Sequence, residues 1–251
     1  MTAAVYLSRA TLRDDAPVEA AGAFLAAHGL GARALSGHHL VWSLFGDDAA
    51  RRRDFLWRED DGGRFHLLST RPPTDRLGVF TLEPPREFAP ALEPGDRLRF
   101  SLRVNATISR RSVDGDGRGK PCDIVMDAIH RLSATGDARA ATRQAVLQDV
   151  ARRWLAARGE RHGFTLVGNS DDAFASAEMW ETVGRDPLRV VAYRTLRIPR
   201  PQRAPAMRIG VLDLEGELIV DDPVKLVARI VRGFGRARGF GCGLMLVRRA
   251  R

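Results

Sequence analysis

Residues 97–104 read Arg97-Leu-Arg-Phe-Ser-Leu-Arg-Val104 and decide the fold of the second half of the chain. Polar and apolar side chains alternate with a strict period of two, which is the pattern of a strand with one buried face. The apolar residues would face a core, and the opposite face would carry the row Arg97, Arg99, Ser101 and Arg103. The pattern therefore predicts a sheet that is apolar on one face and rich in arginine on the other.

The sequence that follows this strand alternates between helical and extended patterns. We expect a polar loop at Ser109–Pro121 and an alanine-rich helix at Arg139–Arg158. Three strands should follow at Phe164–Val167, Val190–Ile198 and Arg208–Val220, the last with a hairpin at Glu215-Gly216. A helix at Pro223–Arg232 and a strand at Gly243–Val247 come last. Together with residues 97–104, this approximates strand-helix-strand-strand-helix-strand. That order is typical of the ferredoxin-like unit, with an antiparallel sheet and helices on one face.

The first part of the chain shows a similar order. We expect a strand at Val5–Leu12 and two helices at Val18–His28 and His38–Phe45, separated by a break at Gly29, Gly31 and Gly37. Three strands should follow at Asp54–Arg58, Arg64–Thr70 and Phe80–Leu82. A proline-rich stretch from Pro84 to Gly95 would separate the two halves. The sequence thus predicts an α+β protein with two tandem ferredoxin-like (RRM-like) domains, residues 1–88 and 95–251, each with an antiparallel sheet.

A glycine-rich segment near the end of the chain reads Gly233-Phe-Gly-Arg-Ala-Arg-Gly-Phe-Gly-Cys-Gly-Leu-Met-Leu246. Glycine permits positive φ and close approach of a ligand to the backbone, and arginine offers a planar fork of donors that suits phosphate. A dinucleotide fingerprint would follow a strand and open a helix, whereas this segment follows a helix and precedes a strand. Two interpretations remain, a phosphate-binding loop and a plain glycine-rich turn in a small hairpin.

The composition limits the classes of function that the chain can have. The chain has 251 residues, 44% hydrophobic content and a formal net charge of +9, and a positive field of that size attracts nucleic acid or an anionic membrane. Its 2 cysteines, Cys122 and Cys242, lie far apart and give no zinc spacing or disulfide framework. The N-terminus has no signal-peptide pattern and no apolar run approaches a membrane span. We therefore expect a cytoplasmic protein with no membrane partner.

The 6 histidines form no zinc motif, so we expect no metal site and no cofactor. His38 and His39 follow Gly37 and would open a helix, with Trp42 one turn after His38 on the same side. One interpretation is a surface pair at the start of a helix. The other is an acid/base group, because an imidazole exchanges protons near neutral pH.

Three blocks of this sequence together resemble the CasE endoribonuclease family, the precursor-RNA processing subunits of the type I-E CRISPR Cascade complex. The first block comprises His38-His-Leu-Val-Trp-Ser-Leu-Phe45, Arg53-Asp-Phe-Leu-Trp-Arg58 and Phe65-His-Leu-Leu-Ser69. The second is Leu102-Arg-Val-Asn-Ala106, which matches the family's L-R-A-N-P phrase and is followed by Lys120. The third is the glycine-rich segment, which matches the family's C-terminal G-I-G-x-x-K-x-x-G-x-G-L-L. The blocks keep their order from Val5 to Val247.

The resemblance implies tandem ferredoxin-like domains, metal-independent cleavage of a repeat hairpin and retention of the processed guide RNA beside other Cascade subunits. The family's catalytic histidine precedes the position of Trp42 by four residues and so maps to His38, with His39 as the alternative by a one-residue shift. The family often has a tyrosine three residues before that histidine, where this chain has Leu35. Ser36, His39 or Arg238 are open candidates for the second acid/base group. Arg238 also stands where the family has lysine in the glycine-rich segment.

The expected chemistry is attack of the RNA 2′-hydroxyl on the adjacent phosphate, which leaves 2′,3′-cyclic phosphate and 5′-hydroxyl ends. His38 would either activate the 2′-hydroxyl or protonate the departing 5′-oxygen. The partners would be the CRISPR repeat hairpin and the mature crRNA, held by basic and glycine residues: Arg97, Arg99, Arg103, Arg110, Arg111, Lys120, Arg236, Arg238, Gly235, Gly239 and Gly241.

Three rival classes remain open. The first is a non-catalytic subunit that binds hairpin RNA as a scaffold. The second is a DNA-binding regulator, for which the chain shows no helix-turn-helix or zinc-finger spacing. The third is a small-molecule enzyme on the same fold, since a fold does not fix a function.

Overall fold

The structure is a computed structural model that describes residues 4–46, 52–60, 63–110, 119–135, 143–168, 188–200 and 204–250. It divides into two compact units, each formed by segments that are separated in the sequence. The first unit comprises Met1–Ala91, Thr195–Ile209 and Val231–Leu244. The second comprises Leu92–Arg194, Gly210–Ile230 and Met245–Arg251. The glycine-rich segment therefore lies in the same unit as His38, although the sequence suggested that it belongs to the C-terminal half.

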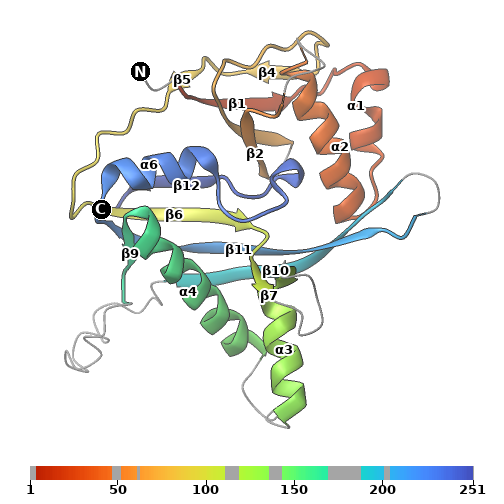
Figure 1. Cartoon of the computed structure of the whole chain (residues 1–251). Coiled ribbons are helices and arrows are strands. Elements are labelled where there is room, and N and C mark those ends of the chain that lie inside the picture. Colours follow the sequence, from red (N-terminus) through yellow and green to blue (C-terminus); the bar gives the residue numbers. More distant parts are fainter. Residues whose placement is uncertain are drawn as a thin grey trace. The chain divides into compact units, whose positions relative to one another are not determined.

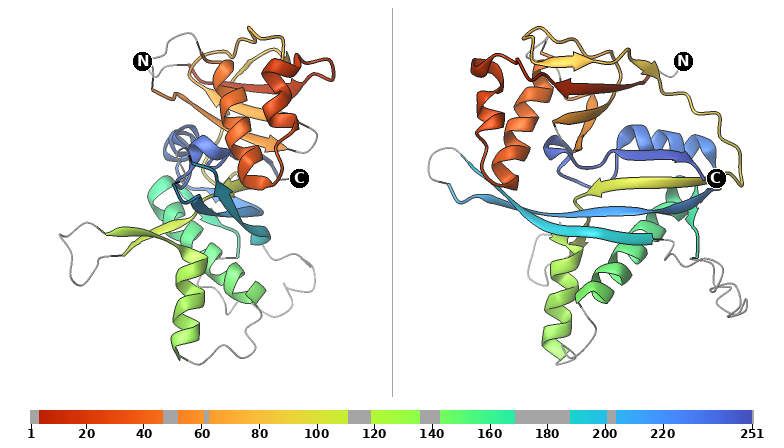
Figure 2. Two further views of the ribbon diagram at one scale, coloured as in Figure 1. Left: turned by 90° about the vertical axis from the view of Figure 1, so that its right-hand side faces the viewer. Right: turned by 180° about the vertical axis from the view of Figure 1, so that it is seen from behind.

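The first unit is built on an antiparallel sheet with the strand order β2-β3-β1-β4, and β5 pairs with β1 (Figure 1). Its strands are β1 (Tyr6–Leu12), β2 (Phe55–Asp60), β3 (Arg64–Ser69), β4 (Phe80–Leu82) and β5 (Arg86–Glu87). Two helices, α1 (Val18–Leu25) and α2 (Leu30–Ser43), connect β1 to β2 and lie side by side (Figure 2). This is the ferredoxin-like strand order, and it confirms the pairing predicted for the N-terminal half.

Pro72 and Pro73 come shortly after β3, and the chain stays irregular up to β4. One expectation for this unit is wrong. The break expected at Gly31 and Gly37 is absent, since both glycines lie inside α2. Gly37 is buried there, and a β-carbon on it would lie only 3.0 Å from Cη2 of Trp57. Close packing of the helix, and not a turn, explains this glycine.

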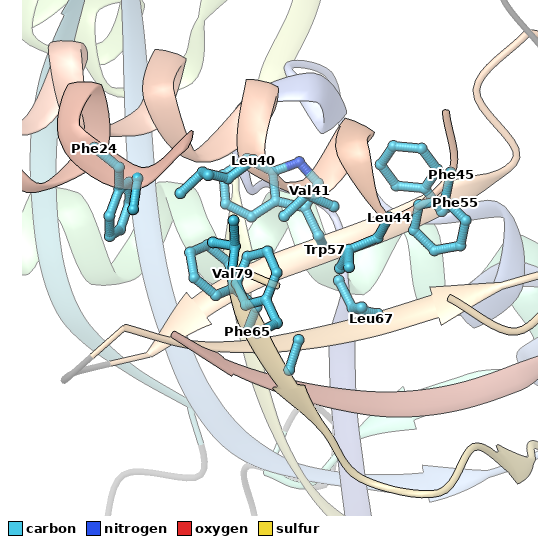
Figure 3. Close-up of a cluster of buried hydrophobic side chains, with 13 residues drawn as sticks. Phe24, Leu40, Val41, Leu44, Phe45, Phe55, Trp57, Phe65, Leu67 and Val79 are labelled. Carbon is cyan, nitrogen blue, oxygen red and sulfur yellow. The ribbon is translucent and has the colours of Figure 1, made fainter. Parts of the chain in front are cut away.

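The core of the first unit is a cluster of aromatic and aliphatic side chains between the helices and the sheet (Figure 3). Phe45 stacks on Phe55 with ring centroids 4.4 Å apart, and Trp57 lies 5.9 Å from Phe65. Trp57 is only 1% exposed and lies beside Leu40 and Val41 of α2 in Figure 3. Burial of these side chains fixes the orientation of α2 on the sheet, and with it the position of His38.

The second unit carries an antiparallel sheet in the order β10-β11-β6-β12, with β9 paired to β11. The strands of this sheet are β6 (Arg97–Val104), β9 (Phe164–Leu166), β10 (Leu188–Ile198), β11 (Met207–Val220) and β12 (Met245–Arg249). The end of β10 from Thr195 and the start of β11 up to Ile209 are assigned to the first unit. The helices α3 (Ile124–Thr135) and α4 (Arg143–His162) lie between β6 and β10, and α6 (Pro223–Arg232) lies between β11 and β12. The order again matches the ferredoxin-like unit.

The strand β6 begins and ends where the alternation predicted, and its apolar residues Leu98, Phe100, Leu102 and Val104 are buried. The hairpin expected at Glu215-Gly216 is wrong. β11 runs straight through both residues, and Gly216 pairs with Phe100 in the centre of β6. Eight consecutive pairs with β6 hold this part of β11 extended.

Part of the loop expected at Ser109–Pro121 is instead a ribbon of β7 (Thr107–Arg110) and β8 (Lys120–Asp123), which pair antiparallel. The helix α3 is not among the elements expected from the sequence. Asp123 caps this helix, because its Oδ1 accepts hydrogen bonds from the backbone N–H groups of Val125 (2.9 Å) and Met126 (3.1 Å). An aspartate directly before Ile124 and Val125 is the local signal that indicates this helix start.

Candidate functional site

His38 lies in the second half of α2 and not at its start, so the expectation that His38 and His39 open a helix is wrong. The side chain of His38 is half-buried, whereas that of the neighbouring His39 is exposed. On the core-facing side of the same helix, Leu40 and Val41 are 5% and 0% exposed. The helix therefore holds His38 on a rigid element at the border between core and solvent.

The glycine-rich segment packs against His38. Residues 238–240 form the short helix η1 (Arg238–Phe240), which contacts both α2 and β2. The rings of His38 and Phe240 have centroids 5.8 Å apart. A β-carbon on Gly239 would lie 3.6 Å from both Cε1 and Nδ1 of His38. The structure thus brings together two parts of the predicted site that are separated by about 200 residues in the sequence.

Trp57 fixes the glycine-rich segment in this place. Its indole N–H donates a hydrogen bond of 3.2 Å to the backbone oxygen of Gly239. Its ring also packs under Gly241, where φ is +75° and a β-carbon would lie 3.2 Å from Cζ3 of Trp57. Gly241 is therefore explained by backbone conformation and by packing on Trp57. Gly239 differs, because the space that a side chain would take there borders His38.

Two arginines lie beside this histidine. A β-carbon on Gly239 would also lie 3.2 Å from Nη1 of Arg53, so Arg53 and His38 border the same small space. The half-buried Arg238 donates a hydrogen bond of 3.3 Å from Nε to the backbone oxygen of Gly235. The sequence pattern predicts Arg238 as a site residue but gives no signal for Arg53. Only the packing of η1 against α2 and β2 distinguishes Arg53 from its neighbour Arg52.

The electrostatics of this site favour a neutral imidazole. Burial lowers the pKa of His38, and the nearby charges of His39 and Arg53 lower it further, while the Gly239 backbone carbonyl acts in the opposite direction. Nδ1 of His38 is buried and has no hydrogen-bond partner among the described residues. Burial and the charge of Arg238 lower the pKa of Arg53. Burial and the charge of Arg232 lower the pKa of Arg238. The site therefore concentrates positive charge and could take up an anion.

The open candidates for a second acid/base group differ in their surroundings. Ser36 donates its hydroxyl hydrogen to the backbone oxygen of Ala23 at 3.1 Å. Leu35, three residues before His38, is a half-buried apolar side chain of α2. His39 is exposed and its ring centroid lies 5.6 Å from that of His38.

The predicted arginine row of β6 is paired with carboxylates of β11. Arg97 and Arg99 contact Glu217 at 3.0 and 2.9 Å, and Arg103 contacts Asp213 at 2.7 Å. These acids lie directly across the β6–β11 pairing, so the sheet face carries both signs of charge. Cross-strand pairs of opposite charge stabilise such a sheet modestly. The row is not the uncompensated positive surface that the sequence suggested.

The remaining predicted residues are placed as follows. Arg236 is exposed, and Gly235 has φ of +62°. The backbones of Arg110 and Lys120 pair in the β7–β8 ribbon, but their side chains lie outside the described part of the structure. Arg111 lies outside the described residues altogether.

Neither a metal centre nor a membrane-crossing helix is found in the described part of the chain. Within the ranges given above, no three histidine, cysteine, aspartate or glutamate side chains gather in a way that could hold a metal ion. No helix within those ranges is both long and apolar enough to cross a membrane.

Known families and proteins are similar to most of this chain. The model of a family described as CRISPR associated protein matches residues 5–249. The CRISPR-associated endoribonuclease Cse3 of Thermus thermophilus is 29% identical over 172 residues, 68% of this chain and 64% of that protein. The alignment thus spans a little less than two thirds of that relative.

Solved structures show the same fold. One is that of Thermus thermophilus Cse3 bound to an RNA representing a pre-cleavage complex, with a TM-score of 0.63 and 23% identity over 98% of this chain and 99% of that one. Another is a chain of a CRISPR RNA-guided surveillance complex, with a TM-score of 0.53 and 17% identity over 98% of this chain and 100% of that one. These likenesses confirm the predicted α+β fold with two ferredoxin-like domains.

Proposed function

Because the chain belongs to the family of CRISPR-associated proteins whose model matches residues 5–249, we propose that it is an endoribonuclease that cleaves CRISPR precursor RNA at repeat hairpins. The cleavage is metal-independent and uses the RNA 2′-hydroxyl as the nucleophile. The protein retains the mature guide RNA within a Cascade-type complex, beside the other subunits. Its place of action is the cytoplasm. The named activity of the Thermus relative supports this function.

The observation that carries the proposal is the half-buried His38 beside Gly239, with Arg53 bordering the same space. Neutral His38 takes the proton of the 2′-hydroxyl while the 2′-oxygen attacks phosphorus. The bond from phosphorus to the 5′-oxygen breaks, and that oxygen takes a proton from solvent. Such proton transfer contributes about 10²–10⁴-fold to a rate. The products are a 2′,3′-cyclic phosphate and a 5′-hydroxyl.

The proposal is tested by incubating the protein with an end-labelled repeat hairpin in the presence of EDTA. Cleavage at one position with the ends named above supports it. Products only when a divalent metal is added would refute the metal-independent mechanism. Tight binding with no products under either condition would instead favour a scaffold that binds hairpin RNA without cleaving it. The specific observation that favours this second function is Leu35 at the position where relatives often have tyrosine.

The pH dependence of cleavage should report the lowered pKa of His38. At sub-saturating protein the rate follows the fraction of neutral imidazole, so it rises with pH and levels off above the pKa of His38. Because burial lowers that pKa, the acidic limb should lie below the ordinary value of about 6.5. His39→Ala should move the limb to higher pH, since the charge of His39 also lowers the pKa of His38. A limb above pH 7 would contradict His38 as the base.

The glycine-rich segment is proposed to bind the RNA backbone through Arg236 and Arg238. Reversing both charges to glutamate should weaken hairpin affinity and reduce the dependence of log Kd on log salt by about one for each lost phosphate contact. Arg64→Glu provides a matched control, because Arg64 is an exposed arginine of the same unit that lies on β3. A salt dependence that is unchanged in the double variant would remove the segment from the RNA contact.

The other predicted RNA-binding residues remain part of the proposal, but they would contact RNA in different ways. Arg97, Arg99 and Arg103 would have to exchange their carboxylate partners for phosphates, which reduces the net gain from each contact. Arg110 and Lys120 belong to the β7–β8 ribbon, Arg111 follows β7 in the sequence, and all three would bind RNA phosphates through their positive charge. Gly235, Gly239 and Gly241 would act through the shape of the segment rather than through side chains.

A further inference from the structure

Arg53 lies immediately before β2 in a segment that is held in place by its neighbour. Asp54 accepts hydrogen bonds at Oδ2 from Arg71 (2.9 Å) and Thr70 (3.1 Å), and its backbone oxygen accepts one from the N–H of Thr70. The carboxylate of Asp54 is therefore engaged on the side of Arg71. Within the described ranges, no carboxylate contacts the guanidinium of Arg53. Its charge is thus available at the edge of the site.

The guanidinium of Arg53 lies close to His38. A β-carbon on Gly239 would lie 3.2 Å from Nη1 of Arg53 and 3.6 Å from Nδ1 of His38. Both side chains therefore pack against the same side of Gly239, where glycine leaves them room to approach the backbone. Arg238 contributes a second positive charge close enough to lower the pKa of Arg53. An anion bound here would relieve the repulsion between the two guanidinium groups.

We propose that Arg53 is a further catalytic residue, which binds the non-bridging oxygens of the scissile phosphate and stabilises the extra negative charge of the transition state. This inference rests on the proposed function, since it assigns a role within the same reaction. Arg53 donates hydrogen bonds and transfers no proton. His38 still takes the 2′-hydroxyl proton, the new bond still joins the 2′-oxygen to phosphorus, and the 5′-oxygen still leaves.

The chemistry of arginine suits this role. Its guanidinium is planar, keeps its charge and offers parallel donors that match two oxygens of one phosphate. Charge on those oxygens grows as the 2′-oxygen adds to phosphorus, so a fixed donor stabilises the transition state more than the ground state. Removal of one such preorganised donor costs about 10²–10³-fold in rate in comparable enzymes. An RNA-anchoring arginine would instead affect binding and cleavage alike.

The test separates these two roles by measuring binding and chemistry on the full chain. Single-turnover rates are measured at saturating protein for the wild type, Arg53→Ala, Arg53→Lys and Arg52→Ala. Arg52 is the matched control, because it is the adjacent arginine, it is exposed as Arg53 is, and its loss changes the net charge equally. Affinity is measured with a hairpin that carries one 2′-deoxy nucleotide at the cleavage position and therefore stays intact.

For Arg53→Ala we expect the rate to fall by about 10²–10³-fold, while affinity for the deoxy hairpin changes by less than about tenfold. Arg53→Lys should cleave faster than Arg53→Ala, because lysine keeps the positive charge. It should stay slower than the wild type, because an ammonium group lacks the parallel donors of the guanidinium. Added guanidinium ion at millimolar concentration should partly restore Arg53→Ala, which a purely structural role would not produce. Arg52→Ala should cleave like the wild type.

Two results would overturn the inference. One is a rate for Arg53→Ala close to that of the wild type. The other is a loss of affinity that accounts for the whole loss of rate. The outcome is distinguishable from failure of the proposed function, because in that case the wild-type protein would itself give no products, or His38→Ala would cleave as fast as the wild type.

Discussion

Replacing His38 with alanine should reduce the single-turnover rate of hairpin cleavage by about 10²–10⁴-fold, because the variant lacks the group that takes the 2′-hydroxyl proton. Hairpin affinity should change little, since burial lowers the pKa of His38 and so favours its uncharged form. The side chain is half-buried at the surface of α2, so the fold should persist. The rate is measured at saturating protein in EDTA, and affinity with the uncleavable 2′-deoxy hairpin.

The matched control for this variant is His39→Ala. His39 is exposed on the next position of the same helix, and a one-residue shift in the family comparison would place the catalytic histidine there. We expect it to retain cleavage within about tenfold of the wild type, as for a residue that lacks acid/base function. If His39→Ala loses cleavage and His38→Ala keeps it, the assignment of the two histidines is reversed.

Replacing Trp57 should have the largest effect on stability and should also impair cleavage. Trp57 is 1% exposed, packs against Phe65 and lies between Gly37 and Gly241. Trp57→Ala would leave a large cavity, and we expect the free energy of unfolding to fall by about 3–5 kcal/mol. Trp57→Phe keeps most of the ring but removes the donor to the Gly239 backbone oxygen, at a cost of about 1–3 kcal/mol. Urea unfolding measures both variants.

The functional part of this prediction concerns the position of Gly239. Without the indole N–H, the glycine-rich segment is no longer fixed beside His38, so Trp57→Phe should cleave more slowly even where it is folded. Trp154→Phe is the control, because Trp154 is 5% exposed and donates from Nε1 to the Thr107 backbone oxygen at 3.1 Å in the other unit. It should lose comparable stability and keep the cleavage rate. Equal cleavage by the two folded variants would contradict the anchoring role of Trp57.

Elements with strong local periodicity were predicted well. β6 and α6 have the predicted bounds, because alternation and a helical apolar face depend only on neighbouring residues. Elements whose conformation depends on distant partners were predicted poorly. Glu215-Gly216 has turn-like composition but stays extended by pairing with β6 more than 100 residues earlier. In the same way, Gly37 suggests a break, yet it lies inside α2 because Trp57 packs on it.

The site residues likewise divide into those that the local sequence indicates and those that depend on distant contacts. His38 and the glycine-rich segment could be found from family resemblance, but their contact depends on how Trp57 holds Gly239. Arg53 stands in the run Arg51-Arg52-Arg53, in which no local feature distinguishes one arginine from the next. The arginines of β6 looked like a phosphate-binding row because their carboxylate partners, Asp213 and Glu217, lie on a strand far along the chain. Charge clusters in sequence do not reveal such compensation.

The proposed function is cleavage of repeat RNA through the RNA's own 2′-hydroxyl. The most direct test compares two hairpins in EDTA, one fully ribose and one with a single 2′-deoxy nucleotide on the 5′ side of the cleaved bond, and maps the ends of all products. We predict that both bind and that only the ribose hairpin is cut, to a 2′,3′-cyclic phosphate and a 5′-hydroxyl. Cleavage of the deoxy hairpin, or products with a 3′-hydroxyl and a 5′-phosphate, would contradict the claim.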